Sequence, residues 1–262
     1  MNLQAVLSQL EQGLSGIVLP TSWCQGRTAF GGVSGALLFQ AVKQVVKPTR
    51  RVLSISTNFI GPLIAEQPFD IKVEVLREGK SASQVLARIE QDGNTCVLAQ
   101  FCFGESRKSE LLVSNDKTHQ LVAPKPEQRI PYIPNMTPEF FQHVEICLQQ
   151  GGMPFTGAMT SHLGGWMRFA EHEGFQDELQ LLALSDAWPP TMLQMYPRPA
   201  PASTMSWYIE FLKPVQLEQS QWFGFEAVTH NSADGYAIEE AKIWHPDGEL
   251  LALSRQTVAV FA

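Results

Sequence analysis

One carboxylate stands inside an apolar stretch of this sequence. Asp186 lies in LSDAWPP, residues 184 to 190, and the apolar stretch around it covers residues 179 to 195. A carboxylate shielded from water has a raised pKa and can act as a general base toward a water molecule. Asp is also a preferred N-cap, and prolines fit the first turn of a helix, so the same residue is typical of a helix start. The sequence leaves both interpretations open, and they are compatible.

Motifs for other kinds of catalysis are missing from the sequence. Gly31-Gly32 followed by Val-Ser-Gly is similar to a phosphate loop or a nucleophile elbow, but Ser34 lacks the second glycine of GxSxG because residue 36 is Ala. The six histidines form no HxxxH or HExxH, and the four cysteines form no CxxC. We therefore expect no metal and no other cofactor, and we expect the cysteines to be buried reduced thiols.

Composition and charge exclude two classes of partner. The chain has 262 residues, is 44% apolar and carries a net charge of −7, and no basic run is longer than a pair such as Arg50-Arg51. It therefore lacks the basic surface that nucleic-acid binding requires. No apolar run approaches the roughly 20 residues needed to cross a bilayer, and residues 1 to 16 have the pattern of an amphipathic helix rather than of a signal peptide. We predict a cytoplasmic protein with no nucleic-acid or membrane partner.

Hydrophobic periodicity predicts an antiparallel meander in the first half of the chain. Alternating runs cover residues 53 to 63, 69 to 79 and 81 to 104, and the break at Asp92-Gly93 is typical of a tight hairpin turn. Before them, the segment from Phe30 to Val46 is apolar or small on nearly every side. A helix without a polar face must be buried, so we predict a helix packed against this sheet.

The strand pattern resumes after a polar, proline-containing segment, residues 105 to 136, which we predict to be a surface linker between domains 1 to 104 and 137 to 262. Strand candidates then cover 140 to 151, 162 to 174, 203 to 214, 221 to 232 and 235 to 261, the last divided by a turn at 246 to 248.

The two halves share one order of elements. Each has a buried helix, a strand ending in a proline (Pro62 and Pro214), a long strand, and a hairpin with an Asp-Gly turn. A repeat of this kind, with its two copies about 150 residues apart, indicates duplication of one α+β unit.

A buried helix wrapped by a curved antiparallel sheet is typical of the hotdog fold, and two such units in tandem resemble the double-hotdog acyl-CoA thioesterases of the bacterial thioesterase II type. Three stretches carry the resemblance, and they gain weight from their order and spacing. They are similar to the family's first helix (AFGGVSGALLFQA, 29 to 41), to the strand that follows a Thr (ASTMSWYIEFLKP, 202 to 214) and to the last strand with a central Gln (ALSRQTVAVF, 252 to 261).

The resemblance implies a catalytic network of three side chains. The family has an Asp at the start of the second-half helix, a Thr or Ser on the strand after it, and a Gln on the last strand. In this sequence they correspond to Asp186, Thr204 and Gln256. The sequence departs from the family pattern after the Thr, where Ser206-Trp207 stands in place of an Asp-His pair. This departure bears on substrate range more than on the reaction.

The implied function is hydrolysis of an acyl-CoA thioester to a free acid and CoA, with no cofactor and no covalent intermediate. Asp186 would activate a water that Thr204 and Gln256 position, and backbone N–H groups near Gly31-Gly32 would receive the oxyanion. The substrate-binding residues that we expect, with the acyl chain between the two halves, are Phe30, Gly31, Gly32, Trp188, Met192 and Trp207. Candidates for contact with the phosphates of CoA are Lys47, Arg50, Arg51 and Arg198, which ordinary surface charge would also explain.

Two alternative functions remain open at this point. A hotdog hydratase or dehydratase would need a catalytic His, and no His lies near either predicted helix start. A non-catalytic acyl-binding protein would use the same pocket without turnover. The resemblance also implies a homo-oligomer, because hotdog sheets usually leave an edge or a face for another copy.

Overall fold

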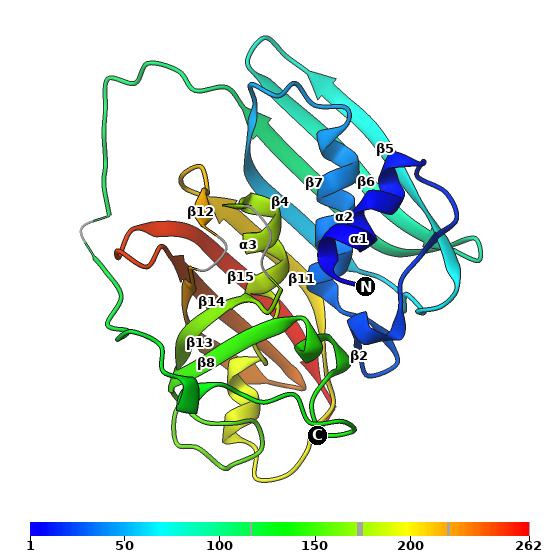
Figure 1. The fold of residues 1–262 in the computed structure, drawn as a ribbon. Helices are drawn as coiled ribbons and strands as arrows, with labels where there is room; N and C mark the ends of the chain where they lie inside the picture. The colour runs from blue at the N-terminus through cyan, green and yellow to red at the C-terminus, as the bar shows by residue number, and fades with distance from the viewer. Residues whose placement is uncertain (116, 172–174, 219–220, 262) are drawn as a thin grey trace.

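A computed structural model describes residues 1–115, 117–171, 175–218 and 221–261. Its main feature is one antiparallel sheet of eleven strands in the order β1-β5-β6-β7-β4-β11-β15-β14-β13-β9-β8 (Figure 1). The strands are β1 (Ile17–Val18), β4 (Arg51–Phe59), β5 (Pro68–Glu78), β6 (Ala82–Gln91), β7 (Asn94–Gly104), β8 (Val144–Gln150), β9 (Leu163–Phe169), β11 (Ala202–Phe211), β13 (Phe223–Ala233), β14 (Tyr236–Trp244) and β15 (Leu250–Val260). Two short two-stranded sheets stand apart, β2 (Cys24–Gln25) with β3 (Thr28–Ala29) and β10 (Phe175–Gln176) with β12 (Leu217–Glu218).

The predicted repeat is confirmed, and the predicted meander is confirmed for β5, β6 and β7. The first strand of the prediction, β4, pairs with β7 and not with β5, the next strand along the chain. Strands β4 to β7 of the first half and β11, β13, β14 and β15 of the second half follow in the same order. Asp92 and Gly93 have positive φ in the turn between β6 and β7, and the second Asp-Gly pair, at 247 and 248, joins the equivalent strands β14 and β15. The last residues of the predicted strand 162 to 174, residues 172–174, lie outside the described residues.

The two halves form one sheet because their equivalent strands pair with each other. β4 and β11 run antiparallel in register from Ser206 opposite Asn58 to Glu210 opposite Ser54. Each of these strands therefore has one neighbour from its own half and one from the other half. The position of the second half is thus fixed relative to the first by backbone hydrogen bonds as well as by side-chain packing.

Two helices carry most of the buried helical surface. Helix α2 (Gly31–Lys43) corresponds to the predicted first-half helix, and α3 (Glu178–Ser185) is its second-half counterpart. They pack against each other inside the curve of the sheet (Figure 1). The remaining helical segments are α1 (Leu3–Leu7), η1 (Ser8–Glu11), η2 (Thr21–Trp23), η3 (Pro126–Gln128), η4 (Glu139–Gln142) and η5 (Thr191–Met195).

The position of Asp186 relative to the helix differs from the prediction. Asp186 is the C-cap of α3 and not the first residue of a helix. The N-cap is Asp177, whose side chain accepts a hydrogen bond from the Leu179 N–H while Gln180 accepts one from the Asp177 N–H. This capping box is readable as Asp-x-x-Gln in the sequence. Pro189 disfavours helical backbone at Trp188, and neither proline has an N–H to continue the helix, so α3 ends where the prediction placed a start.

Glycines allow α2 and α3 to approach each other closely. A Cβ atom on Gly32 would overlap the backbone carbonyl oxygen of Ala183 in α3 and the ring of Phe30. A Cβ atom on Gly35, one turn further along, would meet Leu182 and Trp207 at 3.5 Å, which is ordinary van der Waals contact. The small residues near the start of the predicted helix therefore serve packing between the two halves.

The segment after β7 carries little regular structure. Among its described residues, those from 105 to 125 form no helix or strand, and Leu111, Leu112 and Val113 are exposed. No helix in the described part of the chain is long and apolar enough to span a membrane. Within the same part, no group of three or more His, Cys, Asp or Glu side chains is placed to hold a metal ion.

The packing of α2 on α3 predicts opposite results for two Gly→Ala substitutions on the same helix. Gly32→Ala should lower the free energy of unfolding by about 1–3 kcal/mol or more, because the backbone of α3 must move to admit the methyl group. Gly35→Ala should change it by no more than about 1 kcal/mol, because Ala is the better helix former and the space suffices. Denaturant unfolding of both variants measures the difference, and equal effects would contradict the packing described.

Candidate active site

A cavity of about 400 Å³ lies between the two halves of the molecule. The first half contributes the β2–β3 hairpin, the start of α2 and the end of β4, and the second half contributes the segment after α3 and parts of β11 and β15. Of the described side chains that line it, that of Asp186 is the one ionisable group. The lining residues are Gln25, Thr28, Ala29, Gly31, Ser34, Phe59, Ile60, Gly61, Pro62, Leu63, Val97, Asp186, Trp188, Pro190, Ala202, Ser203, Thr204 and Gln256.

The structure brings Asp186, Thr204 and Gln256 together in one hydrogen-bonded chain. The Thr204 Oγ1 hydroxyl donates to Gln256 Oε1 at 2.9 Å, and Gln256 Nε2 donates to Asp186 Oδ1 at 3.0 Å. The hydroxyl thus fixes which way the amide faces, so that its N–H₂ group points at the carboxylate. Thr204 acts on Asp186 through Gln256 and does not touch it in this arrangement.

The Asp186 carboxylate comes from the second half but meets the N-terminus of the helix in the first half. The backbone N–H of Gly32 donates to it, and a Cβ atom on Gly31 would lie 2.5 Å from Asp186 Oδ2. Glycine at position 31 is therefore required for this close approach. The partial positive charge at a helix N-terminus favours a negatively charged group at this place.

Burial raises the pKa of Asp186 to about 7. The hydrogen bonds from Gln256 and Gly32 lower the pKa, and the nearby carboxylate of Glu239 raises it. Desolvation outweighs the hydrogen bonds because it disfavours the charged form of the whole group. A carboxylate with a pKa near neutrality can take a proton from water and give it back, as a general base and acid must.

A β-bulge puts Thr204 on the inner face of the sheet. Along β11 the side chains of Trp207, Ile209 and Phe211 are buried, so strict alternation would place Met205 inside next. The register against β15 shifts between Thr204 and Ser206, which leaves Met205 as the extra residue with 46% of its surface exposed. Bulges re-aim side chains in this way and are frequent next to active sites.

The expected substrate-binding residues divide into two groups. Gly31 and Trp188 line the cavity, and the backbone N–H of Gly32 donates to the Asp186 carboxylate. Phe30, Met192 and Trp207 are not among the lining residues, because each is packed in the interior. Phe30 stacks on Phe140, Met192 of η5 belongs to a separate apolar cluster, and the Trp207 Nε1–H donates to Ser254 at 2.8 Å. Their apolar character in the sequence reflects core positions.

Sequence reasoning missed most of the first-half wall of the cavity. Phe59 and residues 60 to 63 line it after β4, and Val97 on β7 lies beside them. The repeat contained the signal, because STNFIGP is the first-half equivalent of the strand that carries Thr204. Two equivalent strands that pair with each other bring their ends to one cavity.

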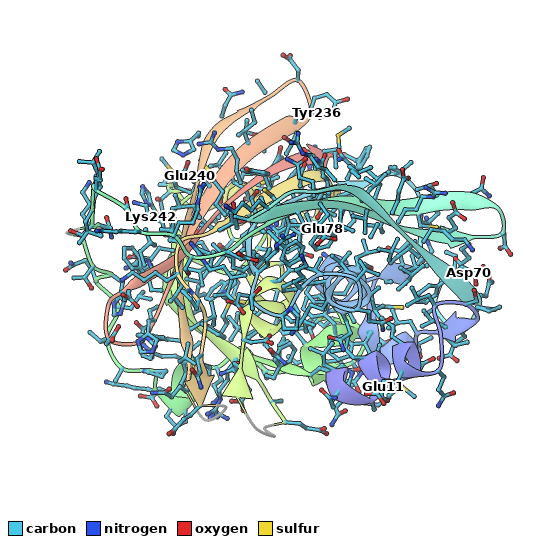
Figure 2. All side chains as sticks on the ribbon, turned by 90° about the horizontal axis from the view of Figure 1, so that it is seen from above. Glu11, Asp70, Glu78, Tyr236, Glu240 and Lys242 are labelled. Carbon is cyan, nitrogen blue, oxygen red and sulfur yellow. The ribbon has the colours of Figure 1, made fainter. Side chains whose placement is uncertain are left out.

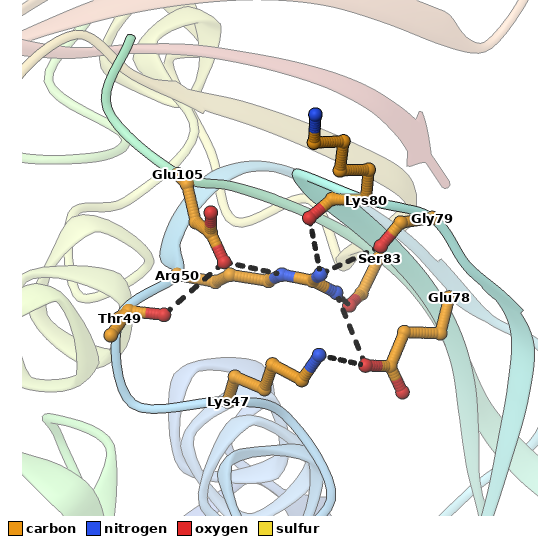
Figure 3. Close-up of polar contacts among 8 residues, drawn as sticks. All are labelled: Lys47, Thr49, Arg50, Glu78, Gly79, Lys80, Ser83 and Glu105. Atoms are coloured by element: carbon orange, nitrogen blue, oxygen red, sulfur yellow. Dashed lines mark hydrogen bonds and ion pairs between the residues drawn. The ribbon is translucent and has the colours of Figure 1, made fainter.

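Three of the basic residues considered for CoA binding are engaged far from the cavity. Helix α2 begins at the cavity, and Lys47 and Arg50 lie beyond its other end, roughly 20 Å away at 1.5 Å per residue. The buried Arg50 guanidinium donates to the Gly79 carbonyl at 2.7 Å and contacts Glu105, and Lys47 pairs with Glu78 at 2.8 Å (Figure 3).

These contacts tie the start of the linker and the β5–β6 hairpin to the loop after α2. Arg51 donates to the Phe211 carbonyl at 3.2 Å. Arg198 is exposed, shortly before the cavity-lining Ala202.

The continuous sheet, the two packed helices and the cavity between the halves define a tandem hotdog protein. The fold is similar to the crystal structure of a hotdog-fold protein from Alicyclobacillus acidocaldarius, with a TM-score of 0.80, 22% identity, and coverage of 95% of this chain and 94% of that one. It is also similar to an acyl-CoA thioesterase II from Mycobacterium marinum (TM-score 0.73, 17% identity, 94% and 91% covered) and to the TesB protein of Mycobacterium avium subspecies paratuberculosis (TM-score 0.75, 18% identity, 100% of both chains covered).

The chain belongs to the acyl-CoA thioesterase family, whose members are thioester hydrolases. The model of the acyl-CoA thioesterase N-terminal domain matches residues 19–104, and that of the C-terminal domain matches residues 117–260. No curated protein matches the chain. The resemblance drawn from the three sequence motifs is thereby confirmed at the level of family and fold.

The raised pKa of Asp186 predicts a pH-dependent effect on stability. The folded pKa of about 7 exceeds the ordinary 3.8, so the folded state binds more protons than the unfolded state between these values. The contribution of Asp186 to stability is therefore fully present below about pH 4 and is lost as the pH rises through about 7. Asn has no proton to lose, so the Asp186→Asn variant does not lose this stability. The melting temperature of the variant minus that of wild type should therefore be larger at about pH 8 than at about pH 5. Thermal unfolding at both pH values tests this, and a constant difference would rule it out.

Proposed function

We propose that this protein hydrolyses acyl-CoA thioesters by direct attack of a water that Asp186 activates. The observation that carries the proposal is that the one ionisable side chain among the described cavity-lining residues is a half-buried carboxylate with a pKa near 7, oriented by Gln256. A group of this kind, beside a cavity large enough for an acyl group, suits general-base attack on a thioester carbonyl.

In the proposed reaction, Asp186 takes a proton from water as the water oxygen bonds to the thioester carbon. The oxyanion that forms would lie near the start of α2, where the Gly31 amide borders the cavity and the Gly32 N–H is already used by Asp186. The carbon–sulfur bond then breaks, and protonated Asp186 returns its proton to the leaving CoA sulfur. Thr204 acts as a positioning residue because its hydroxyl orients Gln256.

The two alternatives receive less support from the same cavity. A hydratase or dehydratase would need a histidine, and none is present among the described lining residues. Ser34 lines the cavity, but its hydroxyl donates to the Phe30 carbonyl at 3.2 Å, so a covalent serine mechanism lacks an activating base. A non-catalytic acyl-binding protein would not need a carboxylate with a raised pKa in its cavity, so the raised pKa of Asp186 favours hydrolysis.

The proposal extends to organisation, assembly and location. We place one hotdog unit in residues 1 to 104 and the other in 137 to 262, with 105 to 136 as linker, although the C-terminal family match begins at 117 within it. A homo-oligomer is supported by exposed Tyr208, Tyr236 and Ile238 on the sheet strands, and light scattering would test it. A cytoplasmic location is supported by the four cysteines, all of which are free thiols.

A panel of short, long and aromatic acyl-CoA substrates, with release of free thiol as the readout, tests the reaction. Asp186→Asn should reduce turnover of the best substrate by roughly 10² or more, because an amide cannot take a proton from water. Asp177→Asn is the matched control, since the same change at the start of α3 keeps a good N-cap away from the cavity and should leave turnover near wild type. Wild-type protein without turnover on any substrate would leave only a binding function.

The role of Thr204 predicts different results for two substitutions of similar size. Thr204→Val removes the hydroxyl that orients Gln256 and should lower kcat roughly tenfold with little change in KM, the loss expected for one hydrogen bond. Thr204→Ser keeps the hydroxyl and should retain most of the activity. Steady-state kinetics of both variants measures this, and equal losses would refute the positioning role.

A further inference from the structure

A second, half-buried carboxylate lies next to the proposed site, on strand β14. Glu239 is directly opposite Gln256 on β15 and directly opposite Thr229 on β13. Residues opposite each other in an antiparallel pair point to the same face, with Cβ atoms about 5 Å apart. Glu239 and Gln256 are therefore side by side on the inner face, and Gln256 lies between Glu239 and its own hydrogen-bond partner Asp186.

Glu239 is held by the segment that follows the two prolines. Its Oε2 atom accepts the Thr191 N–H at 2.7 Å and the Thr191 hydroxyl at 3.2 Å, and that hydroxyl lies 2.6 Å from the Thr229 hydroxyl. Within the described residues, Glu239 has no ion-pair partner and its Oε1 atom has no hydrogen-bond donor. A carboxylate that has lost part of its contact with water is costly to ionise without a cation beside it.

A small cavity lies between Glu239 and the proposed site. Its volume of about 10 Å³ is close to that of one water, and its walls include Glu239, Thr191 and Ser254. Gln256 and Trp188 line both this cavity and the larger one that holds Asp186. Gln256 therefore forms a wall with one carboxylate on either side.

The two carboxylates influence each other electrically. Burial raises the pKa of Glu239 to about 7, while the two hydrogen bonds from Thr191 lower it. Its charge in turn raises the pKa of Asp186. Two carboxylates that share a poorly solvated region do not ionise independently, so their protons belong to the pair.

We propose that Glu239 is a positioning residue of the hydrolysis, a second carboxylate that acts on Asp186 across Gln256 and sets the pH range in which the enzyme works. This inference rests on the proposed function. With Glu239 ionised, Asp186 holds its proton more strongly and is the stronger base once the proton has left. Without that charge, Asp186 would be ionised at lower pH but would be a weaker base toward water.

Other charged groups near these strands face away from the pair. On β14 the next residue, Glu240, points to the outer face, where Arg255 contacts it at 2.6 Å and His230 at 3.9 Å. Glu240 lies along β14 with Tyr236 and Lys242 (Figure 2). The inner-face neighbours contributed by η5, β13 and β15 are the uncharged Thr191, Thr229 and Gln256. At the end of α3 the inner-face neighbours are Ser185 and Trp188, which are also uncharged.

The test compares the isosteric variant Glu239→Gln with Glu240→Gln, the same change at the next residue on the opposite face. Glu239→Gln should move the acidic limb of the kcat/KM pH profile to lower pH by roughly one unit, with KM nearly unchanged. Glu240→Gln should leave the profile where it is. A merely structural role would lower activity equally at every pH, and an unmoved acidic limb in Glu239→Gln would overturn the inference.

Thermal unfolding supplies a readout that does not depend on activity. The four proteins to compare are wild type, Glu239→Gln, Asp186→Asn and the double variant. At about pH 8 the double variant should gain less stability than the sum of the gains of the two single variants, because each substitution relieves the same repulsion. At about pH 5, where both groups carry protons, the effects should be additive. Additivity at both pH values would refute the coupling. Coupling in a protein that turns over no acyl-CoA would refute the proposed function alone.

Discussion

The constraint on which the rest of the structure depends is the placement of one half-buried carboxylate against the end of a helix from the other half of the molecule. Asp186 closes α3, yet it accepts a hydrogen bond from the first turn of α2. Desolvation makes this position costly for a charge, and the Gln256 amide and the Gly32 N–H offset only part of the cost. The outcome is a carboxylate whose pKa lies near neutrality, which neither half would produce alone.

The architecture around Asp186 can be understood as the means of holding that position. Because Gly31 and Gly32 have no side chains, α3 and its terminal carboxylate can reach the start of α2. The pairing of β4 with β11 joins the two halves through backbone hydrogen bonds and so fixes where the two helices meet. The bulge at Met205 then turns Thr204 inward, toward Gln256. A duplicated unit thereby builds an asymmetric site, because only the second copy supplies the carboxylate, the hydroxyl and the amide.

In the neighbouring carboxylate Glu239, as in Asp186, loss of solvent raises the pKa and hydrogen bonds lower it. Its strand position brings it next to Gln256, and the segment after Pro189-Pro190 folds over it through Thr191. Buried polar groups that are linked to one another make a site precise, but they also make it sensitive, because a change at one of them alters the charge balance at the next. The proton affinity of Asp186 therefore depends on Gln256 and Glu239 as well as on Asp186 itself.

The sequence by itself determined the strands, the hairpin turns, the buried first helix, the internal repeat and the family, because periodicity, turn residues and motif order are local properties of the chain. The resemblance to the family implied the three residues of the network, Asp186, Thr204 and Gln256. The tertiary structure alone decided that Asp186 ends a helix rather than starting one, and that Phe30, Met192 and Trp207 pack in the core. An apolar pattern shows that a side chain is buried but not which of several buried places it occupies. Glu239 became visible only through strand register, since its significance comes from a neighbour seventeen positions away in the chain.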